Sequence, residues 1–206
     1  MEAQELRKAI ETSLNKQLIG SNIMSHFCFI TEDSKRTSAY GDPRYVPFYY
    51  YLGKYTTPRN LLEIGFRLGL FSGAFLESCK SVEHFLAYQE SSGSFYSPRI
   101  PARNIRRNHK KKPLEFYYGR VEDEAFLDKL SARNWDLVIV NEEKDYDRHM
   151  FYLDLVWERM NLGGHIVMDY VKSHDPAARA FQSFCKTKNR EPIIFSTRYG
   201  TGLVTR

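Results

Sequence analysis

The chain has 206 residues, a length that suits one domain with a sizeable core. Hydrophobic residues make up 42% of it and aromatic residues 15%, a composition that excludes an intrinsically disordered chain. No apolar run approaches the roughly 20 residues of a membrane span, and the charged N-terminal segment lacks the apolar centre of a signal peptide, so we expect a cytoplasmic protein with no membrane partner.

The N-terminal region, residues 1–44, is predicted to form a helix followed by a loop. Leucine and isoleucine recur every four residues over 2–19 and therefore fall on one face of a helix. The segment 28–45 is typical of a loop, and its "YGDP" sequence of a turn. Residues 46–55 (VPFYYYLGKY) predict a short helix whose tyrosines either pack in the core or stack over a ligand.

From residue 60 onward, predicted strands alternate with predicted helices. Strands are expected at 60–65, 83–90, 114–121, 135–142 and 164–171, with one or two more in 192–206. Helices are expected at 71–80, 99–112, 123–132, 147–160 and 176–188. This alternation predicts an α/β fold, a Rossmann-like doubly wound and mostly parallel sheet with helices on both faces. Ligands of such sheets bind at the carboxyl ends of the strands, near the switch in strand order.

The positive charge of the chain is concentrated in one segment. The sequence "RIPARNIRRNHKKK" (99–112) carries seven Lys or Arg and no acid. Removing these seven charges turns the net charge from +5 to −2, so the basic character is local. The segment is interpreted as a solvated helix face, with binding of an acidic or phosphorylated ligand and binding of nucleic acid as alternatives.

The three cysteines, Cys28, Cys79 and Cys185, are far apart in the sequence. They form no CxxC pair and no metal-ligand spacing. Reduced, mostly buried thiols are therefore expected.

The stretch "NLLEIGFRLGLFSGAFL" (60–76) combines a buried strand with a bare-backbone turn. Glu63 ends the strand, Gly65 opens the turn and Gly69 follows four residues later, so a ligand could approach the backbone and the next helix N-terminus. The G-x-x-x-G spacing differs from the pyrophosphate-binding G-x-G-x-x-G loop and favours a ligand with a cationic amino-acid end. Glu90 ends the second strand, where an acid either binds the two hydroxyls of a ribose or is a surface charge.

Together these residues resemble class I S-adenosylmethionine-dependent methyltransferases. The segment 135–184 is similar to the matching half of small-molecule O-methyltransferases, namely catechol-type enzymes and the sugar and macrolide enzymes grouped with cephalosporin-hydroxylase-like proteins. The resemblance covers about 45–206 and implies one methyltransferase domain with an antiparallel C-terminal strand. Residues 1–44 would then be a helical lid.

The resemblance also implies which residues bind the cofactor, S-adenosylmethionine. Arg120, which follows the third strand, would contact adenine, although the family prefers a small or acidic residue there. The expected cofactor-binding residues are Glu63, Gly65, Arg67, Gly69, Ser72, Glu90, Arg120 and Asn141.

Related enzymes use a divalent cation and a nearby base to deprotonate the acceptor hydroxyl. The resemblance places the metal ligands at Asn141 and Asp169, for Mg²⁺ or Mn²⁺, but Asn141 carries no charge and Tyr170 replaces a further ligand. The alternative is that Asp169 only positions the substrate hydroxyl. Lys144 stands in the register of the family's base, and would otherwise be a solvated charge. His174 and the less favoured His149 are the other candidate bases.

These features imply methyl transfer to a hydroxyl of a small molecule. A carbohydrate is the expected acceptor and a phenolic or catechol-like compound the next, while a homodimer is left open. One alternative is a nucleic-acid methyltransferase that binds phosphates through 99–112. The other is a binding module whose catalysis has decayed, suggested by Asn141 and Tyr170.

Overall fold

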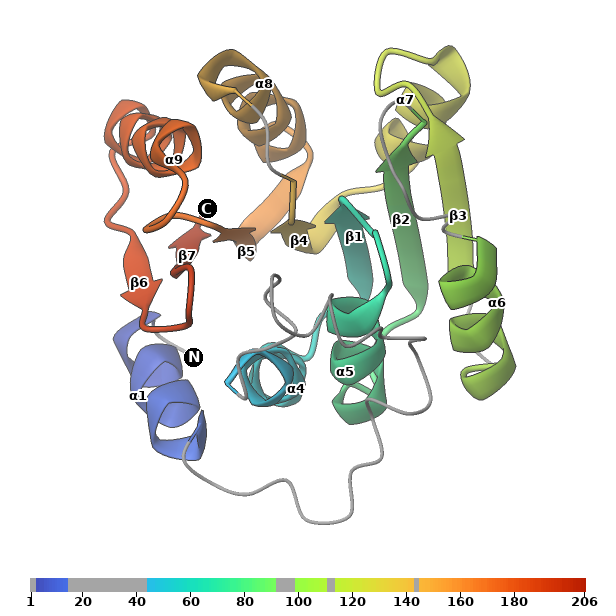
Figure 1. Ribbon diagram of the computed structural model, residues 1–206, viewed down its shortest axis with the longest axis horizontal. Coiled ribbons are helices and arrows are strands. Elements are labelled where there is room, and N and C mark those ends of the chain that lie inside the picture. The colour runs from blue at the N-terminus through green and yellow to red at the C-terminus, as the bar shows by residue number, and fades with distance from the viewer. Residues whose placement is uncertain (1–2, 15–43, 92–98, 111–113, 143–144) are drawn as a thin grey trace.

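The computed structural model of the chain describes residues 3–14, 44–91, 99–110, 114–142 and 145–206 (Figure 1). The helices are α1 (Ala3–Leu14), α4 (Tyr45–Thr56), α5 (Leu70–Ser78), α6 (Arg99–Asn108), α7 (Glu124–Ser131), α8 (Tyr146–Trp157) and α9 (Asp175–Thr187). The strands are β1 (Asn60–Ile64), β2 (His84–Glu90), β3 (Leu114–Gly119), β4 (Trp135–Val140), β5 (Met160–Asp169), β6 (Ile193–Phe195) and β7 (Thr201–Thr205).

The seven strands form one sheet in the order β3-β2-β1-β4-β5-β7-β6. β1 to β5 pair in parallel, and β7 is antiparallel to both β5 and β6. The predicted doubly wound, mostly parallel sheet with an antiparallel C-terminal strand is therefore confirmed. The strand order reverses between β1 and β4, which places the switch point between these two strands.

Helices cover both faces of the sheet, as the alternation predicts (Figure 1). One core cluster joins odd-numbered strand residues such as Leu61 and Ile139 to α4, α5 and α6. The other joins even-numbered residues such as Leu62 and Val138 to α7, α8 and α9. Because neighbouring strand residues point to opposite faces, strands buried on both sides read as unbroken apolar runs.

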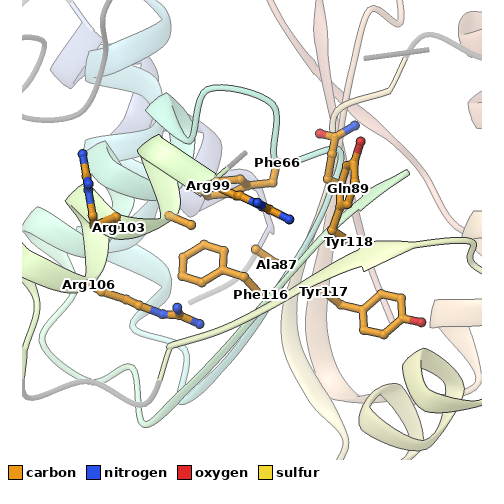
Figure 2. Close-up of a pocket in the computed structure, with 10 residues that line it drawn as sticks. Phe66, Ala87, Gln89, Arg99, Arg103, Arg106, Phe116, Tyr117 and Tyr118 are labelled. Atoms are coloured by element: carbon orange, nitrogen blue, oxygen red, sulfur yellow. The ribbon is translucent and has the colours of Figure 1, made fainter. Parts of the chain in front are cut away.

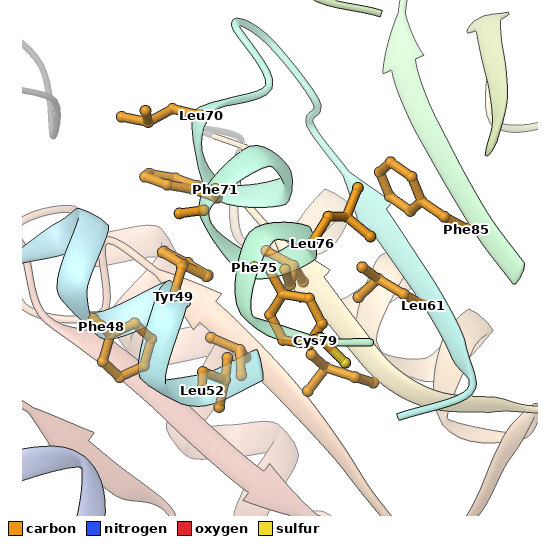
Figure 3. Close-up of a cluster of buried hydrophobic side chains, with 14 of the residues drawn as sticks. Phe48, Tyr49, Leu52, Leu61, Leu70, Phe71, Phe75, Leu76, Cys79 and Phe85 are labelled. Atoms are coloured by element: carbon orange, nitrogen blue, oxygen red, sulfur yellow. The ribbon is translucent and has the colours of Figure 1, made fainter. Parts of the chain in front are cut away.

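The tyrosine-rich helix α4 packs against α5 (Figure 3). The rings of Tyr45 and Tyr49 are fully buried and both stack on Phe71, at centroid distances of 5.6 and 4.3 Å. For these two tyrosines, core packing is therefore the correct alternative. The helix α1 lies against α4 through the buried Leu6 and Ile10, whereas the predicted lid loop falls outside the described residues.

Two of the cysteines confirm the expected buried thiols. Cys79 and Cys185 are free and buried, and burial raises the pKa of the Cys185 thiol to about 12. Cys28 lies outside the described residues. Over the ranges that the structure describes, no helix is long and apolar enough to cross a membrane.

Candidate active site

Four buried polar side chains lie at the carboxyl ends of neighbouring strands, on the α4/α5 face of the sheet. They are Gln89 of β2, Glu63 of β1, Asn141 directly after β4 and Asp169 of β5, and each is at most 5% exposed. All four continue the odd-numbered series of strand residues that fills this core, so strand alternation alone aims them to one side. Polar groups at this depth need partners, and they flank the switch point where such sheets bind ligands.

The loop between β1 and α5 keeps its backbone in left-handed conformations. Gly65, Arg67 and Gly69 have φ of 88°, 45° and 69°. A Cβ at Gly65 would stand 2.3 Å from the backbone oxygen of Asn141, and one at Gly69 would stand 2.6 Å from the ring of Phe66. The loop therefore needs both glycines for its own close packing, a reason that the sequence pattern does not reveal.

Two buried acceptor atoms beside this loop have no hydrogen-bond partner among the described residues, Glu63 Oε1 and Asn141 Oδ1. The other oxygen of Glu63 accepts a short hydrogen bond from the Ser72 hydroxyl. The Asn141 amide group donates to the Gly65 carbonyl at 3.2 Å. A buried acceptor without a hydrogen bond destabilises the fold. Glu63 Oε1 and Asn141 Oδ1 are therefore suited to accept hydrogen bonds from a ligand.

Asp169 is held by two hydroxyl groups. Tyr49 donates to its Oδ2 at 2.8 Å, and Thr201 of β7 donates to its Oδ1 at 2.7 Å. Burial raises the pKa of Asp169 to about 7, although both hydrogen bonds act to lower it. Burial first, and the neighbouring Asp169 second, raise the pKa of Tyr49 well above 10, so this phenol stays a donor.

The two buried carboxyls make the stability of the fold depend on pH. Burial raises the pKa of Glu63 from 4.5 to about 8, with the nearby Asp169 adding to the shift, and that of Asp169 from 3.8 to about 7. Their contribution to stability is thus complete below about pH 4 and is lost as the pH rises to 7 and 8.

Substituting Glu63→Gln is expected to remove about 1.4 kcal/mol per pH unit from the fall in unfolding free energy between pH 5 and 7. The slope is measured by urea unfolding at several pH values. Glu77→Gln, on the exposed side of the same helix as Ser72, is the control that should keep the wild-type slope. An unchanged slope in Glu63→Gln would show that Glu63 is ionised in the folded protein.

A bridge of hydrogen bonds crosses the end of the sheet from β2 to the residue after β5. The backbone N–H of Arg67 donates to Gln89 Oε1 at 2.6 Å, and Gln89 donates to Glu142 at 3.2 Å. The Arg67 guanidinium donates to the Tyr170 hydroxyl at 3.0 Å. Tyr170 has φ of 67° and its ring stacks on Tyr199. Arg67 therefore fixes the loop to both sides of the switch point.

Two predicted cofactor residues lie apart from this group. Glu90 follows Gln89 and so belongs to the even-numbered series, and it pairs at 3.2 Å with Arg148 of α8 on the opposite face. Arg120 follows β3, and its side chain is exposed, 3.7 Å from Glu122. The structure therefore places Gln89, which the sequence analysis missed, at the glycine loop. Glu90 lies at the same end of β2 but points toward α8.

The two histidines among the candidate bases lie on the other face of the sheet from Asp169. His174 caps α9, and its ring lies 6.0 Å from that of His149 of α8. Both helices cover the α8/α9 face, so neither histidine shares the α4/α5 face with Asp169. Lys144 lies outside the described residues.

Among the residues that the structure describes, the side chains around Asp169 do not fit a divalent cation. The hydroxyl of Tyr170, which stands where a further ligand is expected, accepts a hydrogen bond from the guanidinium of Arg67, a positive group that repels a cation. Asn141 adds a neutral oxygen only. Within the described ranges, no group of three or more His, Cys, Asp or Glu side chains could hold a metal ion.

No protein-family model matches the chain, and no curated protein matches it. Solved structures do match. The S-adenosylhomocysteine-bound methyltransferase PaMTH1 of Podospora anserina is 13% identical over 100% of this chain and 97% of that one, with a TM-score of 0.65. TomG of Streptomyces achromogenes, an O-methyltransferase involved in tomaymycin synthesis and solved with S-adenosylmethionine, is 15% identical over 100% and 99%, with a TM-score of 0.62.

An O-methyltransferase of Bacillus cereus, in complex with S-adenosylhomocysteine, is 14% identical over 100% of this chain and 92% of that one, with a TM-score of 0.59. Because the identities are low and the coverage nearly complete, the likeness lies in the fold. The chain thus has the Rossmann-like α/β fold of these methyltransferases.

Proposed function

We propose that this chain is an S-adenosylmethionine-dependent O-methyltransferase that acts on a hydroxyl of a small molecule. The observation that carries the proposal is the placement of Glu63 and Asn141. Both offer a buried acceptor atom that has no partner among the described residues, beside a left-handed glycine loop at the switch point of the sheet. The methyltransferase fold supports the same reading.

The residues at the glycine loop fit the amino-acid end of the cofactor. An ammonium group would supply the donors that Glu63 Oε1 and Asn141 Oδ1 lack, and Ser72 holds the Glu63 carboxyl in place. The loop from Gly65 to Gly69, with Arg67 tied to Gln89, would carry the rest of that end. When bound, the sulfonium supplies an electrophilic methyl group.

The nucleoside end would extend toward β2 and β3. We propose that Glu90 binds the ribose hydroxyls from the end of β2, with its carboxylate oriented by Arg148. Arg120 stands after β3, where the adenine contact is proposed. The amide of Gln89 faces the glycine loop from the same strand end and is a second candidate for the ribose.

Asp169 is proposed to accept the proton of the acceptor hydroxyl. A base with a pKa near the working pH is efficient, and burial places that of Asp169 at about 7. Tyr49 and Thr201 orient the carboxylate, which keeps lone pairs for a further donor. Lys144 and His174 stay predictions as alternative bases, and the opposite-face position of His174 makes it the weaker of the two.

The proposed acceptor is a carbohydrate, with a phenol as the second choice. The support is the likeness of the segment 163–184 to the sugar-modifying branch of the family. A panel of sugars, catechols and phenols with a labelled methyl donor distinguishes the two. Turnover on any of them would also exclude a decayed binding module. A cytoplasmic location is part of the proposal.

Binding of S-adenosylhomocysteine is expected to release up to about one proton from Glu63 at pH 7, because an ammonium beside this carboxyl lowers its pKa from about 8. Calorimetric titrations in buffers of different ionisation enthalpy measure the release. Glu63→Gln should abolish the Glu63 share of it and weaken binding about tenfold or more. No heat of binding in any buffer would overturn the proposed function.

Methyl transfer is expected to be undiminished in excess chelator, since the described residues around Asp169 do not fit a divalent cation. The assay compares initial rates with and without chelator, then after adding back Mg²⁺ or Mn²⁺. Loss of activity that either ion restores would show that a cation takes part.

A further inference from the structure

A cavity of about 320 Å³ lies between α6 and the edge of the sheet formed by β2 and β3 (Figure 2). We call it the α6 pocket. Its lining is formed by Phe66, Ala87, Gln89, Arg99, Ala102, Arg103, Arg106, Phe116, Tyr117 and Tyr118. The volume is that of a small-molecule site.

The floor of the α6 pocket is aromatic. Phe116 of β3 lies at its centre in Figure 2, with Phe66 above it. Their ring centroids are 4.9 Å apart at an interplanar angle of 66°, and Phe85 packs behind Phe116 at 5.9 Å. The two rings meet edge to face, so they form an angled apolar wall against which an aromatic ring can pack.

The helix side of the α6 pocket is positively charged. Arg99, Arg103 and Arg106 recur at spacings of four and three residues, so they share one face of α6. No acid occurs anywhere in the segment 99–112. Arg106 lies 4.7 Å above the Phe116 ring, and neither it nor Arg103 makes an ion pair with any described residue.

Like charges at this spacing repel one another, so the arrangement costs stability in the empty pocket. An anion between the guanidinium groups would reverse that cost, and Arg is the side chain best shaped to bind phosphate or carboxylate. These three arginines are exposed on α6, and they also line a cavity with an aromatic wall, which a solvated helix face does not require.

The α6 pocket is separate from the proposed site of methyl transfer. β3 and β5 stand at positions one and five of the sheet, about 19 Å apart at the usual strand spacing. The two places are nevertheless connected. Gln89 lines the α6 pocket and accepts the hydrogen bond from Arg67, while Phe66 lines it and supports Gly69.

We propose that the α6 pocket binds a small anionic aromatic molecule, one planar ring system that bears a phosphate or carboxylate. The ring packs against Phe66 and Phe116, and the anionic group binds the exposed arginines of α6 that line the pocket, Arg106 foremost. This second site does not depend on the identity of the methyl acceptor or on methyl transfer itself.

The test is a calorimetric titration of the full chain with 1-naphthyl phosphate, with inorganic phosphate and 1-naphthol as controls that carry only one of the two features. One equivalent of 1-naphthyl phosphate is expected to bind at least about tenfold more tightly than either control. The double substitution Arg103→Gln with Arg106→Gln should weaken binding about tenfold or more.

Arg107→Gln is the matched control, because Arg107 is exposed on the same helix but does not line the α6 pocket. It should bind like wild type, and thermal unfolding should show all variants folded. Equal losses in Arg107→Gln and in the double variant, or no binding at about 1 mM, would overturn the proposal.

Two further titrations separate this ligand class from others. Affinity for 1-naphthyl phosphate should be kept in saturating S-adenosylhomocysteine; displacement would assign the pocket to the nucleoside and refute a second site. A single-stranded oligothymidylate should bind more weakly than 1-naphthyl phosphate. Tighter binding that falls steeply with salt, and that also weakens in Arg107→Gln, would instead identify a nucleic-acid surface.

Discussion

Substituting Asp169→Asn is expected to lower kcat about 100- to 10,000-fold, the usual contribution of a general base. The amide has the same shape as the carboxylate, so the side chains of Tyr49 and Thr201 still pack against residue 169. The amide does not accept a proton. Affinity for S-adenosylhomocysteine should change little, since the cofactor is assigned to Glu63 and the glycine loop. The measurement is methyl transfer at saturating cofactor, with calorimetry for the affinity.

The pH profile distinguishes a base from a structural residue. Because only ionised Asp169 accepts a proton, kcat of the wild type should rise with pH through about 7 and then level off. Tyr49→Phe removes a hydrogen bond that lowers the pKa of Asp169, so the rise should move to higher pH. A rise that persists unchanged in Asp169→Asn would assign the base elsewhere, with Lys144 first to be tested.

Substituting Gly65→Ala is expected to reduce the free energy of unfolding by about 2–5 kcal/mol, without any ligand present. Its φ of 88° costs an L-residue about 1–2 kcal/mol, and its Cβ would stand 2.3 Å from the Asn141 backbone oxygen, an overlap that adds about 1–3 kcal/mol. Urea unfolding of the two proteins measures the difference.

Gly163→Ala is the matched control. Gly163 has a similar φ of 79°, but a Cβ there meets nothing within 4 Å, so only the conformational cost of about 1–2 kcal/mol is expected. Equal losses at the two glycines would mean that the chain does not itself require a bare backbone at Gly65. The glycine would then have to be explained by a ligand.

Much of the fold is readable from the sequence because strand and helix periods differ. The apolar runs of β4 and β5 mark strands buried on both sides, and the alternation with helices leads to the parallel sheet that the structure shows. Glu63 is a lone acid inside an apolar strand, next to the turn at Gly65, and this contrast alone marks it as a candidate site residue.

The partners of Asp169 are not readable in this way. Tyr49 lies 120 residues earlier in the chain, and its hydroxyl reaches Asp169 only because α4, packed on α5, brings it within 2.8 Å of that side chain. Thr201 meets Asp169 through the antiparallel register of β5 and β7. Such contacts depend on packing between distant elements, which periodicity does not encode.

The placement of Gln89 beside the glycine loop has a simpler cause. A shift of one residue along a strand turns a side chain to the other face of the sheet. Phe85 and Ala87 belong to the α4/α5 core, so counting by two from them selects Gln89 as the neighbour of the glycine loop. That signal was present in the sequence, but the sequence analysis named only Glu90 at this strand end.

A crystal structure with S-adenosylhomocysteine tests the central claim most directly. The account predicts the ammonium group of the ligand within hydrogen-bond distance of Glu63 Oε1 or Asn141 Oδ1, beside the loop from Gly65 to Gly69. A ligand bound at another place, with both of these oxygens still unpaired, would contradict it.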